Sequence, residues 1–402
     1  MADFIVLATA DWDHPLWTNK QHTAQSLVQA GHRVLYVESL GIRAPRVGSA
    51  DRTRIARRLR RMLQLPRRRL NGLWVWSPPV LPGGHSGIGL QINRCLLRAG
   101  LFLATRWVRF KRPILWTYNP LTTLYLDLNR FEASVYHCVD RIQDQPGMPQ
   151  ARIEVNEQQL SQRVNVLFTT SPELQATHLR WHPGARMFGN VADHRHFSQA
   201  RQSLPCPPAL QDSRSPRIVF MGAIDAYKLD LRLLHQLILR HPEWSFVLIG
   251  PVGECDPSTE VAPLKVCSNV HLVGPQAYDT LPAWLSHADV ALLPLQLNGY
   301  TRNMFPMKFF EYLSAGLPVV ATAIPALAAH ADVAWLCEPH VEAFEQAIRA
   351  ALAGDGPTLD QRFARAQTQT YQLRTEAMLN VLQEKGLLMA DGQQLFGQVP
   401  GP

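Results

Sequence analysis

Short apolar runs and longer amphipathic segments alternate along the chain, and this alternation predicts strands followed by helices. The apolar runs have the length and composition of buried parallel strands. Predicted strands cover residues 4–9, 33–38, 73–76, 113–117, 134–138, 165–169, 217–221, 245–249, 270–273, 290–293 and 318–321. Predicted helices include residues 18–30, 51–65, 88–108, 229–239, 281–287, 306–315, 341–352 and 359–387.

The alternation lapses once, in a proline- and serine-rich stretch at 199–216. Strand-helix alternation on both sides of this stretch predicts two doubly wound, Rossmann-like parallel sheets. We therefore expect a domain over 1–198, a linker at 199–216, a second domain over 217–357, a closing helix at 358–388 that packs back on the first domain, and a loose tail at 389–402. Ligands of such sheets bind outside the carboxyl ends of the strands, so the site is expected in the cleft between the domains.

Composition excludes several classes of protein. The 402 residues are 46% hydrophobic, which is enough for two cores and excludes general disorder. The six cysteines show no metal-ligand spacing, which indicates reduced thiols in a cytoplasmic protein without a metal site. Residues 4–8 are too short an apolar run for a signal peptide, and no run of about 18–20 apolar residues exists to span a membrane.

The basic excess is confined to one segment. Residues 43–69 contain eleven arginines and one aspartate, a net charge of +10, whereas the whole chain carries +8. A solvated helix face and nucleic-acid binding are two interpretations, but no nucleic-acid motif accompanies the arginines. The third is docking on an anionic membrane, because apolar residues recur at helical spacing within the segment and the later helix around 95–110 is apolar with scattered arginines.

A polar, glycine-containing loop feeds the predicted helix that begins at Pro306. Backbone N–H groups from Asn303 through Met304 to Phe305, with the helix dipole, favour an anion there, most naturally a phosphate. Lys308 and Glu311 share one face of this helix and suit a phosphate and the vicinal hydroxyls of a ribose. The alternative is an ordinary surface ion pair between the two.

The strand at 217–221 ends in Gly222, which allows a ligand to approach the backbone. Lys228 follows six residues later, near the start of the next helix, within reach of the same phosphate. An ordinary turn with a solvated lysine explains the same spacing.

The segment from Arg302 to Val320 resembles the nucleotide-sugar-binding segment of retaining GT-B glycosyltransferases of the family 4, or "group 1", type. Glu311 matches the second of that family's two glutamates, which binds the donor ribose. Asn303 stands in place of the first glutamate. Gly222 and Lys228 resemble the family's glycine and phosphate-binding lysine, whereas Ala223 and Leu229 depart from its pattern. The turn at 189–197 also resembles the family's turn between the domains. The loop at Gly274 resembles the family's loop near the base of the nucleotide.

The resemblance implies transfer of a sugar from a nucleoside diphosphate sugar, with retention and without a metal ion or other cofactor. Lys228, Arg302 and the helix start would stabilise the departing diphosphate. His137 ends the strand 134–138, where a family histidine faces the donor, and a buried core histidine is the alternative. Asp13 follows the first strand and suits an acceptor hydroxyl, unless it only shapes a turn.

The expected partners are therefore a nucleotide-sugar donor, a glycan or polyprenyl-linked acceptor from bacterial exopolysaccharide or cell-envelope synthesis, and an anionic membrane surface contacted through 43–69, with no nucleic acid. The expected location is peripheral, on the cytoplasmic face of the plasma membrane. A sugar-nucleotide epimerase of the same fold and a non-catalytic binding protein remain as alternatives. Analysis of the products distinguishes an epimerase from a transferase. Nucleotide binding without turnover would indicate a binding protein.

Overall fold

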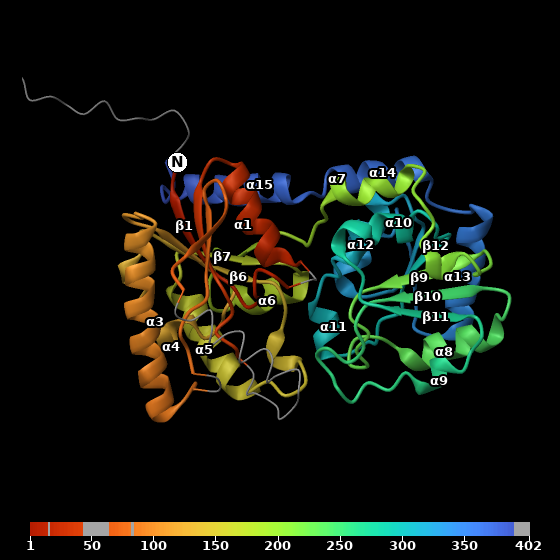
Figure 1. The fold of residues 1–402 in the computed structure, drawn as a ribbon, viewed down its shortest axis with the longest axis horizontal. Helices are drawn as coiled ribbons and strands as arrows, with labels where there is room; N and C mark the ends of the chain where they lie inside the picture. Colours follow the sequence, from red (N-terminus) through yellow and green to blue (C-terminus); the bar gives the residue numbers. More distant parts are fainter. Residues whose placement is uncertain (15–16, 43–63, 82–83, 390–402) are drawn as a thin grey trace, which may run out of the picture.

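The computed structural model describes residues 1–14, 17–42, 64–81 and 84–389. Most of the predicted helix at 51–65 and most of the basic segment at 43–69 lie outside the described residues, and residues 64–65 are not helical. So does almost all of the predicted tail at 389–402. The described part forms two α/β halves side by side (Figure 1).

The first half contains a sheet in the order β3-β4-β2-β1-β5-β6-β7-β8. All neighbouring pairs are parallel except β3 with β4, which is antiparallel. Its strands are β1 Asp3–Leu7, β2 Arg33–Val37, β3 Arg67–Leu70, β4 Leu73–Trp76, β5 Ile114–Thr117, β6 Ser134–Cys138, β7 Val166–Thr169 and β8 Arg186–Met187. The strand order reverses at β1, so the sheet is doubly wound as predicted.

The second half contains an all-parallel sheet in the order β11-β10-β9-β12-β13-β14. Its strands are β9 Arg217–Met221, β10 Ser245–Ile249, β11 Val270–Gly274, β12 Val290–Leu293, β13 Val319–Thr322 and β14 Trp335–Cys337. This is the order of a dinucleotide-binding fold, again with the reversal beside the first strand.

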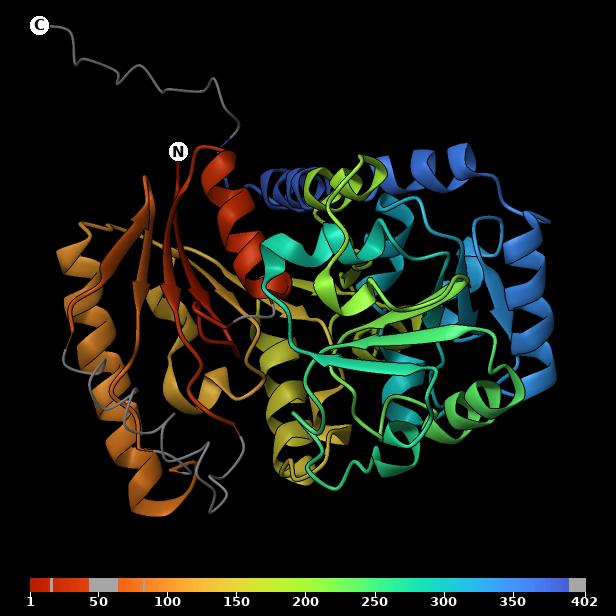
Figure 2. The same cartoon turned by 45° about the vertical axis from the view of Figure 1, so that its right-hand side comes forward.

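Helices cover both sheets (Figures 1 and 2). In the first half they are α1 Asn19–Gln29, α3 Gly87–Trp107, α4 Thr122–Tyr125, α5 Gln150–Arg163 and α6 Pro172–Leu179. The later helices are α7 His194–Phe197, α8 Leu231–Arg240, α9 Ala262–Lys265, α10 Leu281–Leu285, α11 Gly299–Asn303, α12 Lys308–Ser314, α13 Val341–Ala353, α14 Leu359–Gln367 and α15 Tyr371–Glu384.

The boundary between the halves lies earlier than the sequence predicts. Ala192, Phe197, Ala200 and Leu210 all belong to the hydrophobic core of the second half. The chain therefore crosses over near 188–192, and the stretch at 199–216 packs on the second sheet instead of linking two bodies. Scattered apolar residues within this proline-rich stretch are enough to fold it against the core.

The last helical region is two helices, not the single closing helix predicted over 358–388. A break at 368–370 separates α14 from α15, where the Thr370 hydroxyl caps the new helix by accepting from the Leu373 N–H. Ala366 of α14 belongs to the core of the second half, whereas Met378 and Leu382 of α15 belong to the core of the first. Only α15 returns to the first half, where it lies beside α1 (Figures 1 and 2).

The polar loop expected before the helix at 306–315 is partly helical. Asn298 caps the short helix α11 by accepting from the Thr301 N–H, and Thr301 Oγ1 accepts from the Asn298 N–H in return. The next helix, α12, begins at Lys308, two residues after Pro306. The sequence showed the asparagine and the threonine, but not that they would pair across three residues.

Candidate functional site

A cavity of about 190 Å³ lies between the two halves, at the carboxyl edges of both sheets. Its wall includes residues 18–20 at the start of α1, Asp140 after β6, and residues 220–223 at the end of β9. Residues 304–308, which lead into α12, complete it. The cavity is thus where the topology of two doubly wound sheets places a ligand.

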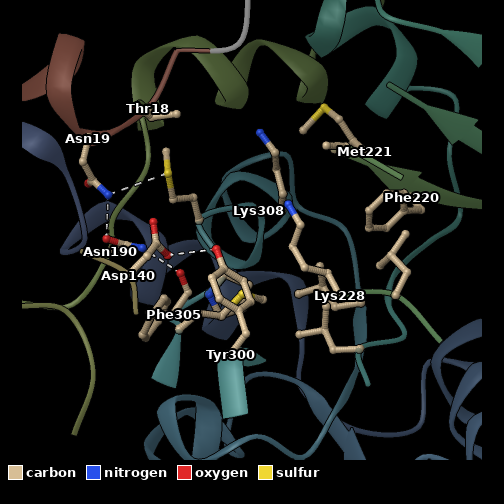
Figure 3. A pocket seen from close by; sticks show the side chains of 18 of the residues that line it. Thr18, Asn19, Asp140, Asn190, Phe220, Met221, Lys228, Tyr300, Phe305 and Lys308 are labelled. Carbon is tan, nitrogen blue, oxygen red and sulfur yellow. Dashed lines mark hydrogen bonds between the residues drawn. The ribbon is translucent and has the colours of Figure 1, made fainter. Parts of the chain in front are cut away.

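Two of the predicted lysines, Lys228 and Lys308, line this cavity together. Figure 3 shows them on one side of the cavity, with Asp140, Asn190 and Asn19 on the other. The structure therefore brings together the two cations that the sequence placed on separate segments, eighty residues apart.

Lys228 lies in the loop that follows β9. Its Nζ is 3.4 Å from the buried Asp225 carboxylate. That carboxylate also accepts from the backbone N–H groups of Cys255 and Asp256, so the loop is held from two sides. Gly222, with φ of +150°, begins this loop and lines the cavity beside the Lys308 side chain. A side chain at this φ would be strained, which explains the glycine.

Lys308 and Glu311 form an ion pair of 2.9 Å, the alternative that the sequence left open. It is not a surface pair, however, because the Glu311 side chain is 4% exposed and that of Lys308 24%. Such a buried carboxylate needs its partner, since an unpaired buried charge is costly. Lys308 therefore both holds Glu311 and presents its stem to the cavity.

Sequence reasoning missed a third lysine, Lys20, which lines the cavity from the first half. It is 8% exposed, and its ammonium lies 5.8 Å from the centre of the Tyr118 ring. Burial lowers its pKa, and the negative charge of Asp140 opposes this effect. Its position in the first turn of the helix after the first strand was the available signal.

Asp140 was also missed as a site residue, although it lies only two residues after the predicted strand 134–138. It lines the cavity and accepts a hydrogen bond of 3.4 Å from the Tyr300 hydroxyl. Burial raises its pKa, while the nearby cations Lys20 and Lys228 act in the opposite direction. The cavity therefore combines three lysines with one carboxylate.

Hydrogen bonds across the two halves hold the cavity walls together. Asn19 Nδ2 donates to Asn190 Oδ1 at 2.9 Å, and Asn190 Nδ2 donates to the Phe305 carbonyl at 2.6 Å. The Ser171 hydroxyl donates to the Asn303 carbonyl at 2.7 Å. Arg374 of α15 donates to Asn19 at 2.8 Å. The backbone of the predicted donor segment is thus fixed by the first half.

The other predicted donor residues fall into two groups. Met304 and Phe305 line the cavity, whereas Gly274, Arg302, Asn303 and Glu311 do not belong to its wall. The Asn303 side chain donates to the Gly299 carbonyl. The Met304 N–H donates to the Thr301 carbonyl at 3.4 Å, so this amide already has a partner, where the sequence predicted a free group for an anion.

The two predicted first-half residues also lie outside the cavity wall. Asp13 pairs with Arg69 at 2.5 Å. His137 is fully buried among the rings of Trp116, Tyr118 and Phe168, and burial lowers its pKa well below the usual value. Both of its ring nitrogens are buried without a hydrogen-bond partner among the described residues.

A buried cluster in the first half brings Cys138, Glu157 and His178 within the reach of one metal ion. The Glu157 carboxylate already accepts from the Tyr136 hydroxyl at 2.6 Å and from Gln143 at 3.0 Å. The cluster does not line the cavity between the halves. We interpret it as a hydrogen-bonded part of the core.

Two doubly wound domains that face each other across a cavity at their carboxyl edges define the GT-B fold. Sucrose-phosphate synthase from Thermosynechococcus elongatus is similar over 96% of this chain and 99% of its own, with a TM-score of 0.70 and 16% identity. HepE of Anabaena, solved with UDP-glucose, is similar over 96% of this chain and all of its own, with a TM-score of 0.64 and 13% identity. At these identities the likeness concerns the fold.

The sequence comparisons identify the second half more closely. Residues 215–354 match the family described as "Glycosyl transferases group 1", the same type that the sequence resembles. The putative teichuronic acid biosynthesis glycosyltransferase TuaH of Bacillus subtilis is 30% identical over 136 residues, 34% of each chain. The alignment therefore spans about a third of that relative's length.

One further observation concerns membranes. Among the helices of the described residues, none has both the length and the apolar composition that crossing a bilayer requires.

Proposed function

We propose that this protein transfers a sugar from a nucleoside diphosphate sugar to an acceptor in the synthesis of a bacterial exopolysaccharide or cell-envelope glycan. The observation that carries the proposal is the convergence of Lys20, Lys228 and Lys308 on one cavity between two doubly wound domains. A cavity lined by three lysines suits a diphosphate ester. The group 1 match of the second half supports a nucleotide-sugar donor.

The chemistry requires stabilisation of a departing diphosphate. Negative charge develops on the leaving oxygen as the anomeric C–O bond lengthens, and preorganised cations stabilise that charge. Each charge-assisted hydrogen bond contributes about 1.5–3 kcal/mol. In our proposal the lysines supply this stabilisation, the reaction needs no metal ion or other cofactor, and the anomeric configuration is retained, as the family resemblance implies.

The donor ribose is assigned to Glu311. Its carboxylate is held by Lys308, whose stem reaches the cavity. Vicinal hydroxyls can donate to the same carboxylate without displacing the lysine, because a carboxylate accepts several hydrogen bonds.

The acceptor is assigned to the first domain, as a glycan or polyprenyl-linked molecule. Asp140 is the carboxylate of this domain that lines the cavity, and it is placed to orient an acceptor hydroxyl. Asp13 remains a prediction for the same task, and His137 remains a prediction as a contact to the donor. The names of TuaH and of WaaG, a glycosyltransferase involved in lipopolysaccharide biosynthesis, support an envelope glycan. We place the reaction at the cytoplasmic membrane face, with the basic segment 43–69 contributing to attachment.

A thermal-shift panel of UDP, GDP, ADP and dTDP tests the donor site. A nucleotide present at 100 times its Kd is expected to stabilise the fold by about 2.7 kcal/mol. The nucleotide that binds then selects the sugar donors for a transfer assay. If none of the four raises the melting temperature, the proposal is wrong.

The products decide between the proposal and its two rivals. Release of free nucleotide and sugar without an acceptor, as the end products of efficient turnover, would indicate an epimerase. Nucleotide binding without any turnover would indicate a binding protein. A new glycoside, or slow hydrolysis of the donor by water in place of the acceptor, supports the transferase.

A further inference from the structure

The outer face of α3 is unusually apolar for a surface. Leu97, Leu101 and Ala104 bury the inner face of the helix against the first domain. On the opposite face large apolar side chains are exposed at helical spacing: Ile88 (80%), Ile92 (40%), Leu96 (36%), Phe102 (58%), Leu103 (62%) and Trp107 (58%). A contiguous stripe of this kind indicates an interaction surface.

The charges on and after this helix all have one sign. No aspartate or glutamate occurs between residues 87 and 112, whereas the basic residues there are Arg94, Arg98, Arg106, Arg109, Lys111 and Arg112. The Arg106 guanidinium lies 5.3 Å from the centre of the exposed Phe102 ring. The charges along this segment that flank the apolar stripe are therefore cations, of which Arg112 pairs with Glu132 at 2.6 Å.

A groove of about 510 Å³ adjoins the same face. Four basic side chains line it, with one carboxylate: Arg98, Arg106, Lys111, Arg130 and Asp127. Phe102 and Phe110 form part of its apolar wall. The groove thus offers a cationic site for an anionic group directly beside the apolar stripe.

The position of α3 leaves this face open. The helix forms the outer edge of the first domain, on the side away from the second domain (Figures 1 and 2). Contact with a surface along α3 would therefore leave the cavity between the domains unobstructed.

We propose that the outer face of α3 docks on a bilayer that contains anionic lipid. Ile88, Phe102, Leu103 and Trp107 enter the interface between headgroups and acyl chains. Arg106 and Lys111 contact lipid phosphates, and the groove takes a headgroup. A second copy of this chain fits less well, because a symmetric contact would bring the same cations together. The inference deepens the peripheral attachment proposed above and rests on that proposal, but assigns the contact to a described helix.

The test uses the full chain and vesicles without nucleotide sugar. Binding is measured by co-sedimentation with vesicles of phosphatidylcholine, either pure or with about one third phosphatidylglycerol. The wild type is expected to bind the anionic vesicles and to be released by salt. The double variant Phe102→Asp/Leu103→Asp is expected to bind at least about tenfold more weakly. Val266→Asp, at an 84% exposed apolar position of the second domain, is the matched control and should bind normally.

A second variant tests the cations separately. Arg106→Glu/Lys111→Glu should lose the preference for anionic vesicles. Vesicle binding equal to wild type in both double variants would overturn the proposal, as would no binding by the wild type. A dimer that Phe102→Asp/Leu103→Asp makes monomeric, with no vesicle binding, would identify a second copy as the occupant and also overturn it. Nucleotide thermal shifts in the same variants separate a failure of docking from a failure of the donor site.

Discussion

Lys228 lies in the loop after β9, where a buried aspartate and two backbone amides determine its position. Its position beside the cavity could be predicted from the sequence because the spacing from Gly222 places it near the carboxyl edge of the sheet. The sequence also left the pairing of Glu311 with Lys308 open as an alternative, and the structure contains this pair. The burial of Glu311 could not be predicted, since it depends on what packs above α12.

Replacement of Lys228 tests the phosphate role. Lys228→Ala is expected to lower kcat/KM for sugar transfer at least about tenfold, because a preorganised cation at the departing diphosphate is lost. The measurement is steady-state kinetics on protein whose melting curve shows a folded state. Lys265→Ala, an exposed lysine of the same domain, is the control and should leave kcat/KM unchanged. Near-normal kinetics in Lys228→Ala would remove the lysine from the mechanism.

Asp140 and Lys20 show why residue-level prediction was incomplete. Each lies two residues from a predicted element boundary, so the sequence placed both at the correct edge of the sheet. Asp13 occupies an equivalent position but pairs with Arg69. Which of several polar residues at an edge reaches the cavity depends on loop conformation, and this is decided by contacts between residues far apart in the chain.

At the scale of elements, α15 is the part of the chain whose role depends most on tertiary structure. Its apolar residues indicate a helix, but not which sheet the helix covers. In the structure Met378, Leu379, Val381 and Leu382 enter the core of the first domain. A helix that follows the second domain in sequence therefore completes the first domain.

Truncation of a buried side chain on α15 tests this arrangement. Leu382→Ala is expected to lower the free energy of unfolding by about 2–5 kcal/mol, because Leu382 is fully buried and a cavity remains. Urea unfolding followed by tryptophan fluorescence measures the loss. Leu373→Ala, on the same helix but 47% exposed, should cost much less. Equal costs for the two variants would contradict the packing of α15 on the first domain.

At the scale of the whole molecule, His22 lies where three parts of the chain meet. Its ring stacks on Tyr371 of α15 at 4.2 Å and lies 6.1 Å from the ring of Tyr278 in the second domain. Burial, with smaller contributions from Arg374, Lys308 and His196, lowers the pKa of His22 to about 3. The native protein therefore keeps this ring neutral in mild acid.

This burial predicts loss of stability in acid. Between pH 6.5 and 3 the unfolded chain binds a proton at His22 that the folded chain does not, so stability falls as pH falls through this window. His22→Phe keeps an aromatic ring and removes the titration. It is expected to reduce the loss of unfolding free energy between pH 7 and pH 5 by about 2 kcal/mol. Urea unfolding at both pH values measures this. A difference no larger than that of the control His235→Phe would refute the assignment.

The sequence by itself determined the order of the central strands and their helices, though not the edge strands β3, β8 and β14, and the edge of each sheet where polar side chains gather. It could do so because apolar periodicity and chain direction are local properties, and parallel strands place their carboxyl ends at one edge. The tertiary structure decided which of those side chains share a cavity, where the domain boundary lies, and which sheet α15 covers. These depend on packing between residues distant in sequence, such as Asn19 with Asn190 and Arg374.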